Sequence, residues 1–299
     1  MAGDMMRRAL ASSRTRRLVV AALAAALVAL LVLAPGALAD ALTPESGGGS
    51  QNAESIDTLY KIALYVAIVI FLIVEGTLLW SLVRYRARRG GPEPAQIRGN
   101  TPLELGWTIA AALILVVLAT VTFVYLGRIE NPPPSDPSGL QSLRSEQAAL
   151  GQPGIPGGKG LTIHVNGQQY LWRFDYPGDP QLFSYHEMVV PTGTTIALTI
   201  TSSDVAHSWW IPKLGGKADA IPGHTNETWF KIKRGLEGSY GGQCAELCGF
   251  GHAIMRARVR AVTPARFQAW EKQQRADIQA AQTGLAQQRS QRERTGGVQ

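Results

Sequence analysis

The chain has 299 residues, of which 45 % are hydrophobic, and a formal net charge of +7. Its basic residues gather before the first apolar run and between the second and third, while residues 127–299 contain 18 basic and 14 acidic residues. Charge arranged in this way indicates membrane topology and excludes nucleic-acid binding as the main function.

The first apolar run, 18–33, follows an arginine-rich start, and the small residues "ALA" at 37–39 come after it. A basic start, a short apolar stretch and a small-x-small exit are typical of a secretory signal peptide. We therefore predict a signal peptide over 1–39, cleaved after Ala39, with 40–59 as an outer N-terminal segment. The alternative is a retained membrane anchor, although the run is short for a span.

Two further apolar runs, 60–83 and 105–126, are each long enough to cross a lipid bilayer as a helix. The segment between them, 84–104, carries an arginine cluster and is therefore expected on the cytoplasmic side. The resulting hairpin has both ends outside, so the rest of the chain is predicted on the periplasmic or outer face of a bacterial plasma membrane. Glu75 within the first span is costly in lipid and predicts a neighbouring membrane subunit.

After the second span, the residue composition of the chain changes twice. A linker rich in proline, glycine and serine, 127–160, leads to a region of short strand-forming runs, 161–263, that predicts an all-β, cupredoxin-like Greek-key sandwich or barrel. In its last run, arginines alternate with apolar residues that begin at Met255, so this thioether is expected to point inward. The tail, 264–299, is predicted to be helical as far as 280 and disordered after it.

Both cysteines, Cys244 and Cys248, lie in the stretch "GGQCAELCGFGHAIM". Because the domain is expected outside the cytoplasm, a disulfide between them is one interpretation. However, His252 and Met255 follow with the spacing C-x3-H-x2-M, and a thiolate, an imidazole and a weak thioether form the ligand set of a copper electron-transfer site. His207 can supply the second histidine from a neighbouring strand.

Because a second cysteine is present, the site could hold either one or two copper ions. With one cysteine the site would hold one ion, whereas Cys244 and Cys248 together could bridge two copper ions, with one histidine on each. Met255 would then be axial to one ion and the backbone carbonyl of Glu246 to the other. Zinc is the alternative metal, but a methionine has no role in a Cys2His2 zinc site.

Several stretches together resemble the cytochrome c oxidase subunit II family over about residues 55–270. They are the hairpin, "GNTPLELGWT" (99–108), "GQQYLWRFDYP" (167–177), "DVAHSWWIPKLGGKADAIPG" (204–223) and "GQCAELCGFGHAIM" (242–255). The resemblance implies a subunit that accepts electrons from cytochrome c at a binuclear, mixed-valence copper centre. It would pass them to haem in catalytic subunit I, where oxygen is reduced to water and protons are translocated.

The resemblance also implies roles for single residues. All the copper positions of the family match: His207, Cys244, Glu246 through its carbonyl, Cys248, His252 and Met255. The side chain of Glu246 is implied as a magnesium ligand at the interface with the catalytic subunit. Glu104 is implied at the mouth of a proton path, and no haem or oxygen site is implied on this chain.

Three features depart from the family pattern. The family commonly has a tryptophan at the position of Tyr170, so Tyr170 and Trp172 are both candidates for the point where electrons arrive. His224 stands where an arginine often follows "AIPG". The outer domain also lacks the acidic balance that attracts basic cytochromes c, which predicts a neutral, acidic or membrane-tethered donor.

Other functions share parts of this pattern. A quinol oxidase subunit of the same architecture would be expected to lack the copper ligands, and a copper-delivery module would need neither the hairpin nor Glu104. A nitrous oxide reductase uses the same kind of copper centre, but its soluble form would have no membrane hairpin. The sequence has no C-x-x-C-H motif, so a fused haem-bearing cytochrome c is not expected.

Overall fold

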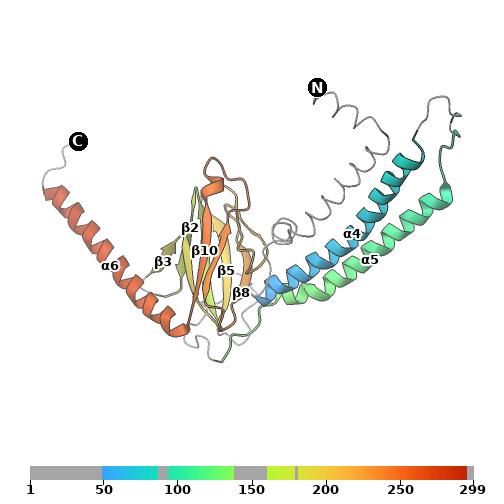
Figure 1. Cartoon of the computed structure of the whole chain (residues 1–299). Helices are drawn as coiled ribbons and strands as arrows, with labels where there is room; N and C mark the ends of the chain where they lie inside the picture. The colour runs from blue at the N-terminus through green and yellow to red at the C-terminus, as the bar shows by residue number, and fades with distance from the viewer. Residues whose placement is uncertain (1–48, 87–92, 94, 138–159, 179–180, 295–299) are drawn as a thin grey trace, which may run out of the picture. The chain divides into compact units, whose positions relative to one another are not determined.

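The computed structural model describes residues 49–86, 93, 95–137, 160–178 and 181–294. The predicted signal peptide, 1–39, lies outside these residues. The described chain begins with two long helices that lie side by side, α4 (Gln51–Arg84) and α5 (Thr101–Glu130) (Figure 1). Both are long and apolar enough to cross a membrane.

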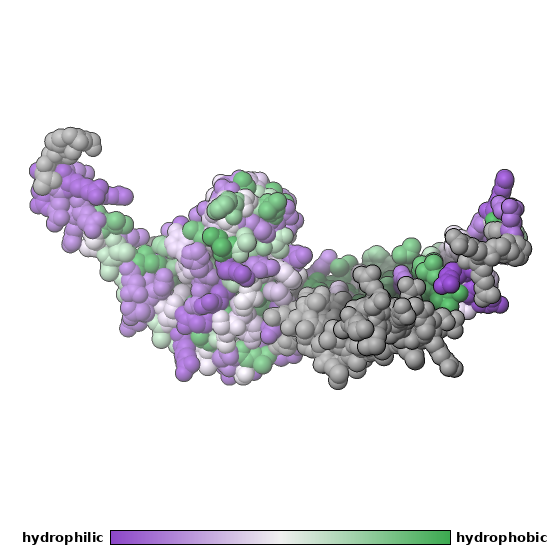
Figure 2. All heavy atoms as spheres, turned by 45° about the horizontal axis from the view of Figure 1, so that its top comes forward, coloured by the Kyte–Doolittle hydropathy of each residue, from purple (hydrophilic) through white to green (hydrophobic). Residues whose placement is uncertain are grey.

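The two helices extend beyond the apolar runs that predicted them. Large apolar side chains are exposed along both, and the uncovered part of this surface is mainly green in Figure 2. A helix that is apolar all round is suited to lipid or to a membrane partner rather than to water. The residues that α4 adds at its start, 51–59, pack on the β-domain: the Asn52 side-chain amide donates to the carbonyl of Trp229 over 3.1 Å.

The β-domain contains three sheets. Its five-stranded sheet has the order β3 (Leu182–Tyr185), β2 (Leu171–Tyr176), β1 (Leu161–Gln168), β5 (Thr195–Ser202) and β8 (Asn226–Lys231). A three-stranded sheet has the order β4 (Glu187–Pro191), β10 (Arg256–Val262) and β9 (Gly238–Gln243). β6 (His207–Trp209) and β7 (Ala218–Ala220) form a two-stranded sheet.

The two larger sheets enclose one hydrophobic core. β1 pairs in parallel with β5, and β10 pairs in parallel with β4, whereas the other strand pairs are antiparallel. Parallel neighbours that are distant in sequence require crossovers between the sheets, as in a Greek-key sandwich. The predicted fold class, a helix hairpin followed by a cupredoxin-like β-sandwich, is therefore confirmed.

Strand β10 shows why the sequence folds in this way. Ala257, Val259 and Ala261 are buried, while Arg256 and Arg258 are exposed, as the period-two pattern predicts. Met255, just before the strand, is also buried. The alternation of β10 thus extends back to Met255, the last residue of the preceding loop, and places its side chain in the interior of the domain.

The C-terminal helix differs from the prediction. α6 (Pro264–Arg294) continues well past residue 280, so the disorder expected for 281–294 is wrong. Its first turns are anchored by Phe267 and Trp270, whose rings contact Tyr176. The later turns are rich in alanine, glutamine and arginine, and these residues favour a helix even where no core covers them.

Candidate metal centre

The candidate site forms where the loop between β9 and β10 meets β6. The loop is closed at its base, since the Cys244 amide donates to the carbonyl of Met255 over 3.0 Å. The next amide, that of Ala245, donates to the carbonyl of Ser208 over 2.9 Å and so ties the loop to β6. These backbone bonds bring His207 on β6 against a loop that follows it by more than thirty residues in sequence.

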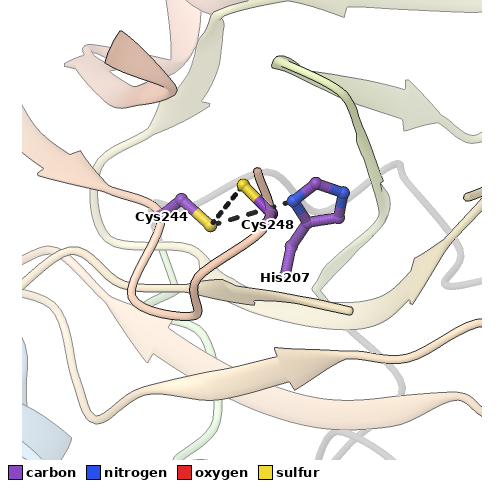
Figure 3. A group of neighbouring side chains, drawn as sticks. All are labelled: His207, Cys244 and Cys248. Atoms are coloured by element: carbon purple, nitrogen blue, oxygen red, sulfur yellow. Dashed lines mark hydrogen bonds between the residues drawn. The ribbon is translucent and has the colours of Figure 1, made fainter. Parts of the chain in front are cut away.

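Three buried side chains form the centre of the site (Figure 3). The Cys244 and Cys248 sulfurs lie 3.9 Å apart, and His207 Nδ1 lies 3.8 Å from the Cys244 sulfur. The ligand atoms of these three residues all lie within 4.8 Å of one another, so the group can hold a metal ion. Figure 3 shows the imidazole directed toward the two sulfurs.

The other predicted ligands surround this centre. His252 Nδ1 lies 3.8 Å and Met255 Sδ 3.9 Å from the Cys248 sulfur. The backbone carbonyl oxygen of Glu246 lies 3.2 Å from the Cys244 sulfur. The structure thus brings together all six residues singled out from the sequence, with a nitrogen and a weaker donor beside each sulfur.

The two cysteines are free thiols in this structure. A disulfide needs a sulfur–sulfur distance of about 2.05 Å, well below the observed 3.9 Å. Burial, with the neighbouring Cys244 thiol as a second cause, raises the pKa of Cys248 to about 11. A metal ion that binds here must therefore displace a firmly held proton.

Asp204 orients the histidine from β6. Its carboxylate lies 2.9 Å from His207 Nε2 and accepts hydrogen bonds from the backbone amides of Gln169 and Val205, each over 2.6 Å. Desolvation alone would raise the pKa of Asp204, but the hydrogen bonds from His207 and from the two amides outweigh it and lower the pKa to about 2.

The charge of Asp204 determines which nitrogen of His207 faces the sulfurs. An ionised carboxylate only accepts hydrogen bonds, so Nε2 carries the proton and Nδ1 presents its lone pair toward Cys244. Sequence analysis missed this role of Asp204. The available signal was an acid three residues before a candidate metal-binding histidine.

Comparison with known proteins identifies the family. The model for the transmembrane domain of cytochrome C oxidase subunit II matches residues 45–124, and the model for its periplasmic domain matches 177–262. A probable cytochrome c oxidase subunit 2 from Rickettsia bellii is 31% identical over 237 residues, which are 73% of this chain and 78% of the relative. The chain belongs to the cytochrome c oxidase subunit II family.

A second relative agrees with this assignment, and a solved structure is also similar to part of the chain. Cytochrome c oxidase subunit 2 of Thermostichus vulcanus is 33% identical, with 79% of each chain covered. The crystal structure of the periplasmic domain of subunit II of cytochrome oxidase from Bradyrhizobium japonicum is 35% identical and covers 40% of this chain and 96% of that chain, with a TM-score of 0.38. Membership of this family makes the chain a subunit of an oxidoreductase complex, with a two-helix membrane anchor.

The two aromatic candidates for electron arrival lie at different depths. Trp172 is fully buried and meets the His207 ring edge-on, with 5.9 Å between the ring centroids. Tyr170 is only half-buried and lies against the metal-site loop, where its hydroxyl would be 2.8 Å from a Cβ placed at Gly249. Of the two, only Tyr170 offers a surface to a protein outside the domain.

Three further side chains singled out from the sequence, those of Glu104, Glu246 and His224, do not contribute to the group of six donors. Glu104, in the first turn of α5, accepts a hydrogen bond from the Asn100 amide over 3.1 Å, while the Asn100 side chain accepts from the Leu103 amide over 3.2 Å. These two hydrogen bonds cap the start of the helix. The Glu246 side chain is exposed, as is His224, which lies 3.2 Å from Asn226 Oδ1.

Proposed function

We propose that this chain is the subunit through which electrons enter a cytochrome c oxidase. It accepts them from a cytochrome c at a binuclear copper centre and passes them to haem in the catalytic subunit, where oxygen is reduced and protons are translocated. The observation that carries the proposal is the pairing of donors: two free thiols, 3.9 Å apart, each with its own imidazole at 3.8 Å.

This pairing favours two metal ions over one. Cys244 has His207 and the Glu246 carbonyl as neighbours, and Cys248 has His252 and Met255. Each half thus contains a thiol, an imidazole and one weaker donor, so the six residues would hold two ions. Soft thiolate and thioether ligands favour copper over zinc.

The chain's residues prepare the site for electron transfer. Copper bound there supplies a one-electron redox couple. Asp204 fixes the orientation and tautomer of His207, and the backbone bonds at the base of the loop hold both cysteines in place. Burial of the sulfurs keeps water away, so little rearrangement accompanies a change of charge.

Other assignments rest on the family resemblance. Tyr170 is the proposed point of electron arrival, with Trp172 behind it as a core residue beside His207. The exposed side chain of Glu246 is free to reach a magnesium ion at the interface with the catalytic subunit, and Glu104 marks the mouth of a proton path. The β-domain, 161–263, then lies on the outer face of a bacterial plasma membrane, after cleavage of the signal peptide.

The test is to load the full-length chain with copper and record stoichiometry and the electron paramagnetic resonance spectrum. We expect two copper ions per chain and a hyperfine pattern from one unpaired electron shared by both nuclei. Cys244→Ser should leave at most one copper with an ordinary four-line signal, while Ser239→Ala on β9 should behave as the unchanged chain. A four-line spectrum from the unchanged chain would overturn the proposal.

A further inference from the structure

A cavity of about 450 Å³ lies where the start of α4 and the end of α5 meet β8. Asn52 and Glu130 line it from the helices, and Glu227 and Trp229 line it from the strand. None of these residues belongs to the metal centre. The function proposed above gives this cavity no role.

The cavity lies at the depth of lipid headgroups. The apolar run of α4 begins at Tyr60 and that of α5 ends at Leu126. At about 1.5 Å per residue, Glu130 lies roughly 6 Å and Asn52 roughly 12 Å beyond these limits. The polar layer on each side of a bilayer is roughly 5–7 Å thick, so the cavity opens into or just above it.

The side-chain amides and the indole of the cavity wall each donate a hydrogen bond within the chain. Asn52 Nδ2 donates to the carbonyl of Trp229 over 3.1 Å, and the Trp229 indole donates to the carbonyl of Ile129 over 2.8 Å. Asn131 Nδ2 donates to the carbonyl of Gly127 over 2.9 Å. These bonds hold the helix ends in place and tie the start of α4 to β8.

Hydrogen-bond acceptors, in contrast, remain unpaired. Asn52 is 2% exposed, and its Oδ1 has no hydrogen-bond partner among the described residues. The side chains of Glu130 and Glu227 form no ion pair within the described part of the chain. A buried, unpaired carbonyl oxygen lowers stability unless a donor reaches it.

One cation also lines the cavity, but it does not neutralise these acids. Lys217 places its ammonium 5.0 Å from the centroid of the Trp210 ring and forms no ion pair with another described residue. The wall therefore offers two carboxylates and a buried amide oxygen, with one ammonium. This distribution suits a ligand that has several N–H donors and a positive charge at one end and a negative group at the other.

We propose that this cavity binds the headgroup of an aminophospholipid such as phosphatidylethanolamine. Its primary ammonium has N–H donors for Asn52 Oδ1 and for the carboxylates of Glu130 and Glu227, and its phosphate can meet Lys217. A single metal ion is a poorer occupant, because the cavity is many times larger than the roughly 30 Å³ that one water occupies in the liquid.

The first test compares two lipids whose headgroups differ in methylation of the amine, which removes the N–H donors and adds bulk. Full-length chain is stripped of lipid in detergent and mixed with phosphatidylethanolamine or phosphatidylcholine of identical acyl chains, and bound lipid is counted by native mass spectrometry. We expect about tenfold stronger retention of phosphatidylethanolamine, since the trimethylammonium of phosphatidylcholine cannot donate N–H hydrogen bonds. Equal retention overturns the proposal.

Variants then locate the site. The double variant Glu130→Gln, Glu227→Gln should reduce the preference to less than twofold, whereas Glu54→Gln should keep it, because Glu54 lines a separate polar cavity at the same helix end. A preference that survives the double variant, or that Glu54→Gln also removes, contradicts the assignment. Copper stoichiometry should be unchanged in every variant, so failure of this inference is distinct from failure of the proposed function.

Two further outcomes decide the source of the amine. Soluble phosphoethanolamine, added at the same concentration as the lipid, should not displace it, because the acyl chains hold the headgroup beside the apolar helices. Displacement at equal concentration would assign the cavity to a soluble amine and overturn a lipid site. In the assembled oxidase, a side chain of another subunit filling the cavity would overturn it as well.

Discussion

The loop end of the β-domain and the helix hairpin differ in where their side chains find partners. At the loop end, buried thiols, imidazoles and a thioether contact one another, and Asp204 holds His207 from behind. Along the hairpin, large apolar side chains such as Phe71, Leu115 and Phe123 are more than half exposed. The first region is therefore organised by contacts within the chain, whereas the second needs lipid or other subunits.

The strongest test of this contrast is Asp204→Asn. If contacts within the chain organise the metal centre, loss of the ionised acceptor should loosen the tautomer and orientation of His207. We expect copper affinity to fall about ten- to hundredfold, the usual cost of removing such a supporting group. Competition with a chelator of known affinity measures it.

Asp219→Asn is the matched control for this change. Asp219 lies on β7, the partner strand of β6, and its exposed side chain forms no hydrogen bond or ion pair with a described residue. Its affinity for copper should stay within twofold of the unchanged chain. Equal affinities for both variants would mean that the metal alone orders the site.

A smaller effect is expected from Gly251→Ala. A Cβ at Gly251 would collide with the ring of Tyr170, which packs on the loop. Overpacking of this kind costs about 1–3 kcal/mol, so the midpoint of thermal unfolding of the metal-free chain should fall by several degrees. Gly238→Ala should leave the midpoint unchanged, because a Cβ at Gly238 meets nothing within 4 Å. Equal shifts would show that Tyr170 does not support the loop.

The clustering of the candidate ligands could be predicted because most of them are close together in the sequence. Cys244, Cys248, His252 and Met255 lie in one loop, and the alternation in β10 fixes the direction of Met255. Metal-ligand chemistry and strand periodicity are local rules, and both apply directly to the sequence.

The supporting contacts could not be predicted in the same way. Asp204 reaches the Gln169 amide only because β5 and β1 pair in parallel, and this register is not readable from either strand alone. The acceptor-rich cavity similarly depends on Asn52 meeting Trp229, although 177 positions separate them in sequence. The extra length of α6 was missed for another reason, since polar composition was interpreted as disorder despite high helix propensity.

The smallest expected effect concerns the surface of the β-domain beside the buried metal centre. Tyr170, between β1 and β2, is half-buried and packs against the metal-site loop, while Trp172 is enclosed in the core. In the assembled oxidase, Tyr170→Leu should lower the rate of copper reduction by cytochrome c several-fold and leave the copper spectrum unchanged. Stopped-flow absorbance follows this rate directly.

Two variants of the same kind separate a specific route from a general surface effect. Tyr185→Leu changes another exposed tyrosine, on β3, and should leave the rate unaltered. Tyr170→Trp restores the residue common in the family and should match or exceed the original rate. If Tyr170→Leu reacts as fast as Tyr185→Leu, electrons do not arrive through Tyr170, and the exposed rim of the loop around His252 becomes the remaining path to the buried sulfurs.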